Sequence, residues 1–177
     1  MKLVILDRDG TINHDSDQYI KSPAEWKPIK GSLEAIARLS QNGWRVVVAT
    51  NQSGIGQGLF DMATLNAIHD TMHRAVHQAG GRIDAIFFCP HPRDSNCECR
   101  KPKPGMLLEI AKRMNVELEG VPVVGDSLRD LQAAAAAGAR PVLVLTGKGT
   151  KTRDAGGLPA GTVIFPDLAA VGAQYAP

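Results

Sequence analysis

The stretch Leu3-Val4-Ile5-Leu6-Asp7-Arg8-Asp9-Gly10-Thr11 decides the fold of this chain. Its aliphatic run, bounded by charge and glycine, predicts a buried strand of a parallel sheet, and such sheets bind ligands beyond the carboxyl ends of their strands. Two carboxylates one residue apart repel each other, so placing Asp7 and Asp9 together requires a cation, a shared proton or a strongly polar pocket. A plain strand-to-turn transition is the alternative, since Asp and Gly are common in turns.

The same strand-and-polar-end pattern recurs along the chain. Residues 44–49 run into Thr50-Asn51-Gln52-Ser53-Gly54, and residues 121–124 run into Gly125-Asp126-Ser127. Further strands are predicted at 83–89, 142–145 and 163–165, with amphipathic helices between the strands. This alternation predicts an α/β protein, with a mainly parallel sheet in a three-layer Rossmann-like fold. Residues 147–161, rich in Gly, Thr and Lys, are expected to form a surface connection.

Length and composition narrow the function. A chain of 177 residues with 44% hydrophobic content favours one domain over residues 1–177, without a separate cap domain. The formal charge of +2 and the lack of a basic stripe argue against a nucleic-acid partner but allow a small anionic substrate. No apolar run reaches membrane-spanning length, and the N-terminus lacks an export pattern, so we expect no membrane partner and a cytoplasmic location.

The three cysteines all lie in one short loop, at residues 89–99. Cys89, His91, Cys97 and Cys99 provide four ligands of the type that zinc prefers, and a set without an open position indicates a structural zinc site. Coincidental thiols in a polar loop are the alternative. Because the loop has almost no apolar residues, metal ligation would order it and would fix Arg100, which follows it.

One further group of potential ligands lies on a predicted helix. His69, His73 and His77 are spaced four residues apart and so share a helix face. No nearby carboxylate completes a metal-binding set, so we expect a solvated face there.

The ordered strand-end motifs resemble those of the haloacid dehalogenase superfamily of phosphatases. The resemblance rests on Asp7-Arg8-Asp9-Gly10-Thr11, on Thr50, on the lysine after Arg100 and on Gly125-Asp126, and it covers about residues 3 to 146. It implies that Asp7 attacks phosphorus and that Asp9 protonates the leaving oxygen and then activates water. It also implies that Thr50 and Asn51 donate to phosphoryl oxygens.

The resemblance further implies a cation and a basic residue at the site. Mg²⁺ would be held by Asp7, the Asp9 carbonyl and Asp126, which supply the hard oxygen ligands it prefers. Two lysines compete to neutralise the phosphoryl charge, and the resemblance favours Lys101 over Lys103. Asp130 either orients that lysine or the metal waters, or it is an exposed carboxylate in a first helical turn.

Within the superfamily, three motifs together narrow the resemblance: residues 7–13, residues 50–54, and a zinc loop ending in Cys99-Arg100-Lys101-Pro102. They resemble a capless branch that removes one phosphate from a heptose bisphosphate, in nucleotide-activated heptose synthesis for lipopolysaccharide. A monomer is expected there. Two features depart from the pattern of this branch. The Asp15 segment is one residue longer than expected, and Ser127 stands where the branch often has Lys. Histidinol-phosphate phosphatases and a non-catalytic sugar-phosphate binding module are the alternatives. The resemblance implies six substrate contacts, namely Asp15, Tyr19, Asn51, Gln52, Ser53 and Arg100.

Overall fold

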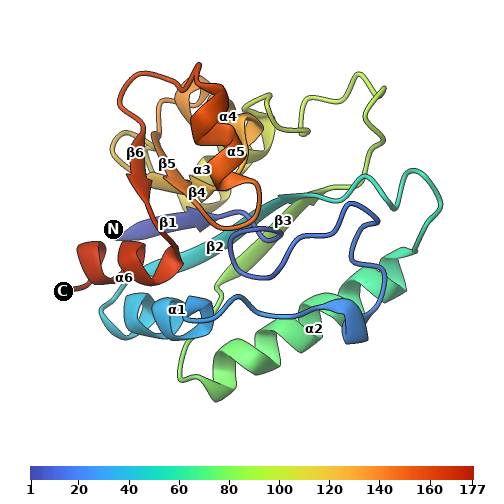
Figure 1. Ribbon diagram of the computed structural model, residues 1–177, viewed down its shortest axis with the longest axis horizontal. Helices are drawn as coiled ribbons and strands as arrows, with labels where there is room; N and C mark the ends of the chain where they lie inside the picture. The colour runs from blue at the N-terminus through green and yellow to red at the C-terminus, as the bar shows by residue number, and fades with distance from the viewer.

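A computed structural model describes all residues, 1–177, and shows one six-stranded sheet between two layers of helices (Figure 1). All strand pairs are parallel, and the strand order is β3-β2-β1-β4-β5-β6. The strands span Leu3–Leu6 (β1), Arg45–Asn51 (β2), Ala85–Cys89 (β3), Pro122–Gly125 (β4), Arg140–Val144 (β5) and Val163–Phe165 (β6). The predicted α/β class is confirmed, and the sheet is wholly parallel.

The helices divide between the two faces of this sheet. One core cluster packs α1, α2 and α6 against the sheet, and a second cluster packs α3 and α4 on the opposite face (Figure 1). The helices span Ser32–Gln41 (α1), Met62–Gln78 (α2), Gly105–Met114 (α3), Leu128–Ala136 (α4), Gly149–Ala155 (α5) and Leu168–Tyr175 (α6), and a 3-10 turn, η1, spans Pro23–Glu25.

Strand β1 is aliphatic along its whole length because both of its faces are buried. Val4 and Leu6 belong to the core on one face, whereas Leu3 and Ile5 belong to the core on the other, because successive side chains of a strand point to opposite faces. Both faces are covered, so neither set of side chains can be polar. The stretch that opens the sequence is therefore the centre of the sheet.

The strand order places the polar strand ends together. Strand β1 lies between β2 and β4, and the chain moves to opposite sides of β1 to form them, which creates a crevice at the carboxyl ends of these strands. Residues 50–54 and 125–127 follow the same edge as Asp7 and Asp9. No additional group of strands or helices interrupts the alternation of strands and helices to form a separate cap domain, as the sequence predicted.

One predicted segment differs in the structure. Residues 147–161 were expected to form an irregular surface connection, but they include α5, in which only Gly149 is buried. A seven-residue helix without an apolar face carries no periodic signal in the sequence, so it escaped detection. None of the helices combines the length and apolar character that a membrane crossing requires.

Candidate active site

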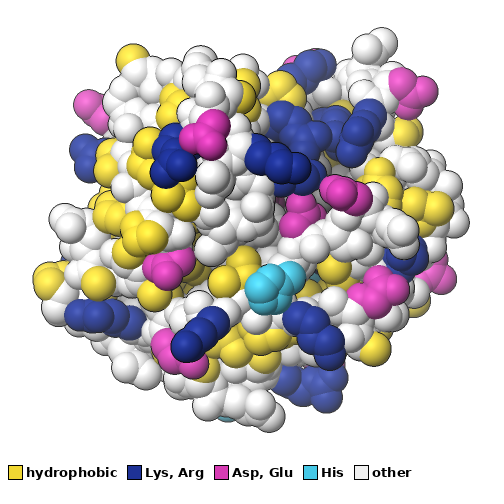
Figure 2. All heavy atoms as spheres, viewed as in Figure 1, with side chains coloured by type: hydrophobic (Ala, Val, Ile, Leu, Met, Phe, Trp, Pro, Cys, Tyr) yellow, Lys and Arg dark blue, Asp and Glu magenta, His cyan; other side chains and the backbone are white.

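The carboxyl ends of β1, β2 and β4 open into a polar pocket lined by 17 residues, of which only one is hydrophobic. Figure 2 shows basic side chains gathered along the upper edge of this hollow in the surface, with acidic side chains in and beside it. Twelve of the residues singled out in the sequence line the pocket: Asp7, Asp9, Asp15, Tyr19, Thr50, Asn51, Ser53, Arg100, Lys101, Asp126, Ser127 and Asp130.

Gln52 is the one predicted substrate contact that does not line the pocket. Its side chain is buried, and its amide nitrogen donates to the Thr50 hydroxyl at 3.0 Å and approaches the Asp9 carboxylate at 3.4 Å. Gln52 therefore supports two pocket residues from outside the pocket. Its predicted contact with substrate stays a prediction.

Lys101 is the central cation of the pocket. Its buried ammonium group donates to Asp7 at 3.0 Å, to Asp130 at 2.6 Å and to the Ala49 carbonyl at 2.9 Å, which uses all three of its protons. Burial alone would lower the pKa of Lys101, but Asp130 and then Asp7 raise it above the usual value. The ammonium group therefore remains charged beside Asp7. Lys103, the lysine that the resemblance did not favour, lies at the surface, where it contacts Glu98.

The two alternatives for Asp130 are resolved by its burial. Its carboxylate is buried, where it contacts Lys101 and accepts from the backbone N–H and the hydroxyl of Ser127. Burial would raise the pKa of Asp130, but Lys101 outweighs it and keeps the pKa below the usual value. Asp130 is thus an ionised residue that orients Lys101, and it also closes the capping box of α4.

The donor set for a cation lies between β1 and β4. Carboxylate oxygens of Asp7, Asp126 and Asp130 lie within 4.8 Å of one another. Burial is the main reason why the pKa of Asp7 is well above its usual value, and the negative charge of Asp130 raises it further, although Lys101 opposes this shift. Clustered carboxylates with this electrostatic cost fit a hard divalent cation such as Mg²⁺. The chain makes room for the cluster at Gly10, where a Cβ atom would collide with the Asp126 carboxylate.

The protonation of Asp126 leads to a pH prediction. Burial, and then Asp130, raise the pKa of Asp126 to about 7, although the backbone N–H of Lys148 opposes the shift. A proton and Mg²⁺ would compete for this carboxylate, so we expect Mg²⁺ affinity to fall up to about tenfold per pH unit as the pH decreases below 7.

Calorimetric Mg²⁺ titrations at pH 6, 7 and 8 check this prediction. At pH 6.5, repeating the titration in buffers of different ionisation enthalpy should reveal proton release on binding. An affinity that stays constant between pH 6 and pH 8 contradicts the assignment of Asp126 as a ligand.

Asp9 is held by a buried network that the sequence did not reveal. Its carboxylate contacts the Arg8 guanidinium through two nitrogens and accepts from the Asn13 amide at 2.9 Å. Burial would raise the pKa of Asp9, but the charge of Arg8 outweighs it and lowers the pKa below the usual value. Arg8 in turn contacts His69. The prediction that the His69 face is solvated is therefore wrong for His69, which is buried, and right for His73 and His77, which are exposed.

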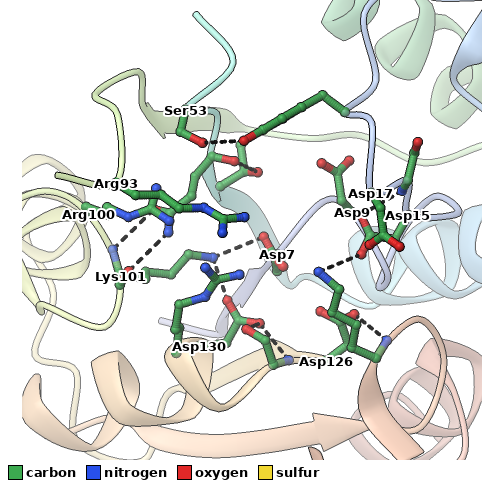
Figure 3. A pocket seen from close by; sticks show the side chains of 17 residues that line it. Asp7, Asp9, Asp15, Asp17, Ser53, Arg93, Arg100, Lys101, Asp126 and Asp130 are labelled. Carbon is green, nitrogen blue, oxygen red and sulfur yellow. Dashed lines mark hydrogen bonds and ion pairs between the residues drawn. The ribbon is translucent and has the colours of Figure 1, made fainter. Parts of the chain in front are cut away.

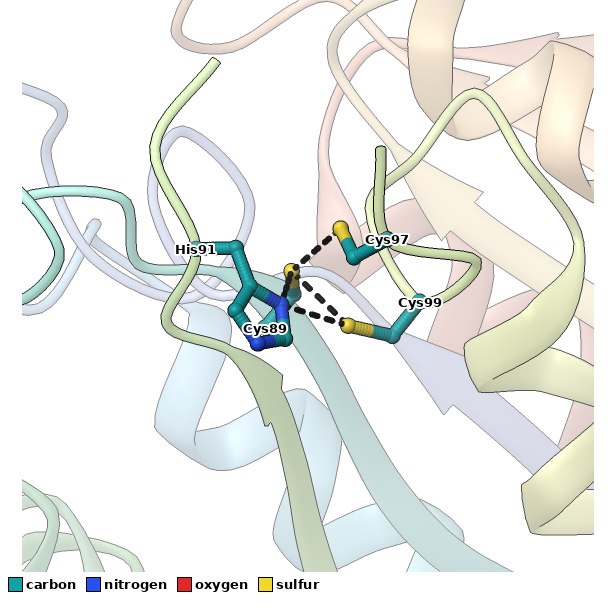
Figure 4. A group of neighbouring side chains, drawn as sticks. All are labelled: Cys89, His91, Cys97 and Cys99. Atoms are coloured by element: carbon teal, nitrogen blue, oxygen red, sulfur yellow. Dashed lines mark hydrogen bonds between the residues drawn. The ribbon is translucent and has the colours of Figure 1, made fainter. Parts of the chain in front are cut away.

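The cysteine loop brings its four predicted zinc ligands together (Figure 4). Three sulfur atoms and the Nδ1 atom of His91 lie within 4.8 Å of one another, with contacts between 2.9 and 3.7 Å. All three cysteines are free thiols. Burial raises the pKa of the Cys89 thiol to about 12, so this thiol needs a neighbouring cation to become a thiolate ligand. This donor set fits a tetrahedral zinc ion without an open position.

Three basic residues of the pocket were missed in the sequence. Arg93, Arg129 and Lys148 line it, from the cysteine loop, the first turn of α4 and the residue before α5. Figure 3 shows Arg93, Arg100 and Lys101 on one side of Asp7, and Asp9 and the Asp15 segment on the other. A cation shortly after a strand end was the only available signal, and it is a weak one.

The guanidinium groups around Arg100 lack neutralising carboxylates. Burial is the largest cause that lowers the pKa of Arg100, and the positive charges of Arg129 and Arg93 lower it further. The buried Nη1 atom of Arg100 has no hydrogen-bond partner. Buried donors and close like charges are costly unless a ligand satisfies them. These arginines therefore form a subsite that suits an anion.

The loop after β1 closes the opposite side of the pocket. The Tyr19 hydroxyl accepts from the Gln57 amide at 2.8 Å and contacts the Ser53 hydroxyl at 3.4 Å, which ties this loop to the loop after β2. Asp15 pairs with Lys148 at 3.4 Å. Side chains from three loops thus converge on the rim, where a substrate's non-reacting part would lie.

A haloacid dehalogenase-like hydrolase is the class that this fold and this arrangement of aspartates and lysine define. Consistent with that class, the family model described as HAD-hydrolase-like matches residues 98–171. The heptose bisphosphate phosphatase of Bordetella bronchiseptica, in a crystal structure with magnesium and phosphate, superposes with a TM-score of 0.98 at 64% identity, covering 99% of this chain and 98% of that one.

Curated relatives specify the family further. The D-glycero-β-D-manno-heptose-1,7-bisphosphate 7-phosphatase of B. bronchiseptica is 65% identical over 98% of this chain and 97% of its own length. The enzyme of the same name from Pseudomonas putida is 57% identical over 97% of each chain. This chain belongs to the family of D-glycero-β-D-manno-heptose-1,7-bisphosphate 7-phosphatases.

Proposed function

We propose that this chain is a Mg²⁺-dependent phosphatase that removes the 7-phosphate of D-glycero-β-D-manno-heptose 1,7-bisphosphate. The observation that carries the proposal is the hydrogen bond from Lys101 to Asp7, in the same pocket as the anion subsite around Arg100. The name shared by relatives at 57–65% identity supports the substrate. The reaction would belong to the synthesis of nucleotide-activated heptose for lipopolysaccharide. The cytoplasmic location and the monomeric state of the protein stay predictions.

The first chemical step would form an aspartyl phosphate. A carboxylate oxygen of Asp7 attacks phosphorus, the bond from phosphorus to the C7 oxygen breaks, and that oxygen takes a proton from Asp9. Because Arg8 keeps Asp9 ionised in the free site, Asp9 would take up this proton as the substrate binds, when the negative charge of the phosphate beside it raises its pKa. Thr50 and Asn51 line the pocket beside Asp7 and would donate to the phosphoryl oxygens. The charge of Lys101, 3.0 Å from Asp7, would stabilise the developing negative charge.

The second step would restore the enzyme. Asp9 takes a proton from water, the resulting hydroxide attacks phosphorus, and inorganic phosphate leaves as the Asp7 carboxylate is regenerated. Asp7 and Asp126 would hold Mg²⁺ through their carboxylates, Asp9 through its carbonyl. When bound, Mg²⁺ offsets the negative charge of the phosphoryl oxygens and of these carboxylates.

The subsite around Arg100 would hold the phosphate that is not cleaved. A guanidinium group matches a phosphate because its planar donors can form two parallel hydrogen bonds. The unpartnered Nη1 atom of Arg100 and the neighbouring Arg93 and Arg129 support this role. Arg129 supplies a positive charge near Ser127, where a lysine was expected.

A comparison of turnover on three substrates tests the proposed function. Phosphate release is measured with Mg²⁺ from both C1 anomers of heptose 1,7-bisphosphate and from histidinol phosphate. We expect the β-anomer of the bisphosphate to have the highest kcat/KM. Turnover of histidinol phosphate alone would replace the proposed substrate, and binding without any turnover would indicate a non-catalytic sugar-phosphate binding module.

Arg100→Ala separates the two phosphates. We expect kcat/KM for the bisphosphate to fall by about 100-fold, because a charge-assisted contact of about 2–3 kcal/mol is lost, while kcat/KM for heptose 7-phosphate changes little. The matched control is Arg113→Ala, which removes an exposed arginine of α3 that pairs with Glu109. An equal loss on both substrates would contradict the assignment of Arg100 to the second phosphate.

A further inference from the structure

A buried arginine lies directly behind Asp9, the proposed acid and base of the reaction. Arg8 has 0% exposure, and its Nε and Nη2 atoms contact the two oxygens of Asp9 at 2.8 and 3.2 Å. Its remaining terminal nitrogen, Nη1, lies 3.1 Å from Nε2 of His69 on α2. A buried charge is costly unless its hydrogen bonds are satisfied, so both contacts determine where the guanidinium group can lie.

The contact fixes the protonation of His69. Because arginine only donates hydrogen bonds, Nε2 of His69 must accept, so the ring proton lies on Nδ1 and the ring is neutral. Burial, and then the charge of Arg8, lower the pKa of His69 to about 3, in agreement with a neutral ring. His69 does not line the pocket. Arg8 is the side-chain hydrogen-bond partner of His69, so it is the direct link from His69 to Asp9.

The two oxygens of Asp9 are held unequally. Oδ1 accepts from Arg8 at 2.8 Å and from Asn13 at 2.9 Å, whereas the Oδ2 contacts, with Arg8 and Gln52, are longer, at 3.2 and 3.4 Å. Oδ1 is thus the anchored oxygen, and Oδ2 is the one that can exchange a contact for a substrate atom. Asp9 lines the pocket with Asp7 (Figure 3).

We propose that His69 is a positioning residue that acts through Arg8 to orient the Asp9 carboxyl group toward the leaving oxygen. This proposal rests on the proposed function, because it assumes that Asp9 protonates that oxygen. Without an acceptor at residue 69, Arg8 would move to satisfy Nη1 elsewhere, and the anchored oxygen of Asp9 would move with it. A displacement of about 1 Å at a catalytic group can reduce the rate by about 100-fold.

The leaving group distinguishes positioning of the acid from a general loss of structure. A sugar alkoxide is a poor leaving group and needs the proton from Asp9, whereas 4-nitrophenolate is stable as an anion and leaves without it. The constant kcat/KM covers the steps up to the first bond cleavage. Misplacing Asp9 should therefore reduce kcat/KM for the sugar phosphate far more than for 4-nitrophenyl phosphate.

The experiment compares His69→Leu, which removes the acceptor, with His69→Gln, which can restore one, on both substrates at saturating Mg²⁺. We expect His69→Leu to reduce kcat/KM for the heptose bisphosphate by about 10- to 100-fold and for 4-nitrophenyl phosphate by less than about threefold. His69→Gln should recover most of the loss. The matched control is His73→Leu, one turn along α2 at an exposed position, which should leave both constants unchanged.

Each outcome bears on one proposal. Wild-type protein that releases no phosphate from the heptose bisphosphate refutes the proposed function itself. Wild-type turnover combined with an equal loss on both substrates, or with no loss in His69→Leu, refutes only the role of His69. If His69→Leu does not fold, His69→Asn, whose shorter amide is displaced from Arg8, replaces it in the same comparison with His69→Gln.

Discussion

Asp7→Asn should reduce phosphate release from the heptose bisphosphate by at least about four orders of magnitude, because an amide cannot attack phosphorus and replacing a nucleophile removes the whole covalent route. The substitution keeps the shape of the side chain. Lys101 retains Asp130, which lies 2.6 Å away, so its charge stays paired. The measurement is kcat/KM at saturating Mg²⁺, together with acid quenching of enzyme mixed with labelled substrate, where only the wild-type protein should retain phosphate.

Stability separates this loss from unfolding. Burial raises the pKa of Asp7, which means that the fold disfavours its ionised form, so a neutral amide should not lower the melting temperature. The matched control is Asp70→Asn, which removes an exposed carboxylate from α2 that pairs with Arg74. Activity that survives Asp7→Asn would exclude the aspartyl-phosphate mechanism.

Removing the proposed zinc ion should have the second largest effect. In Cys99→Ser, or after treatment with a strong chelator, we expect kcat/KM to fall by about 100-fold and the melting temperature to fall by about 10 °C, as a loss of about 3 kcal/mol would cause in a domain of this size. Arg100 and Lys101 follow Cys99 directly, so disorder of the loop would displace these two cations of the pocket at once.

A neighbouring residue provides the control for this prediction. Glu98→Gln changes an exposed residue between two of the ligands, whose only ion pair is with Lys103 at the surface, and it should leave zinc content and activity unchanged. Elemental analysis of the purified protein gives the zinc content directly. Protein without zinc but with full activity, or Cys99→Ser with wild-type activity, would contradict a structural zinc site.

The sequence was sufficient for the sheet and for the strand ends. β1 must be aliphatic because both of its faces are covered, and the polar residues after it lie where the chain leaves the sheet. The four ligands of the cysteine loop were equally visible, since they lie within eleven residues. Such features are local, because they depend on the alternation of a strand or on ligands separated by a short loop.

Pairings between distant residues could not be predicted in this way. Lys101 reaches Asp7 across 94 residues and Asp130 across 29, and which of two lysines does so depends on the path of the cysteine loop. His69 looked like part of a solvated helix face because spacing does not say which side of α2 faces the sheet.

The sequence by itself therefore determined the α/β class, the order of the motifs and the candidate ligands, since each follows from residue types at short spacing. Only the tertiary structure decided that Arg8 is buried between Asp9 and His69, that Gln52 lies behind the pocket, and that Arg93 and Arg129 join Arg100. The physical reason is that burial and charge pairing depend on the positions of several elements at once, which no single stretch of sequence specifies.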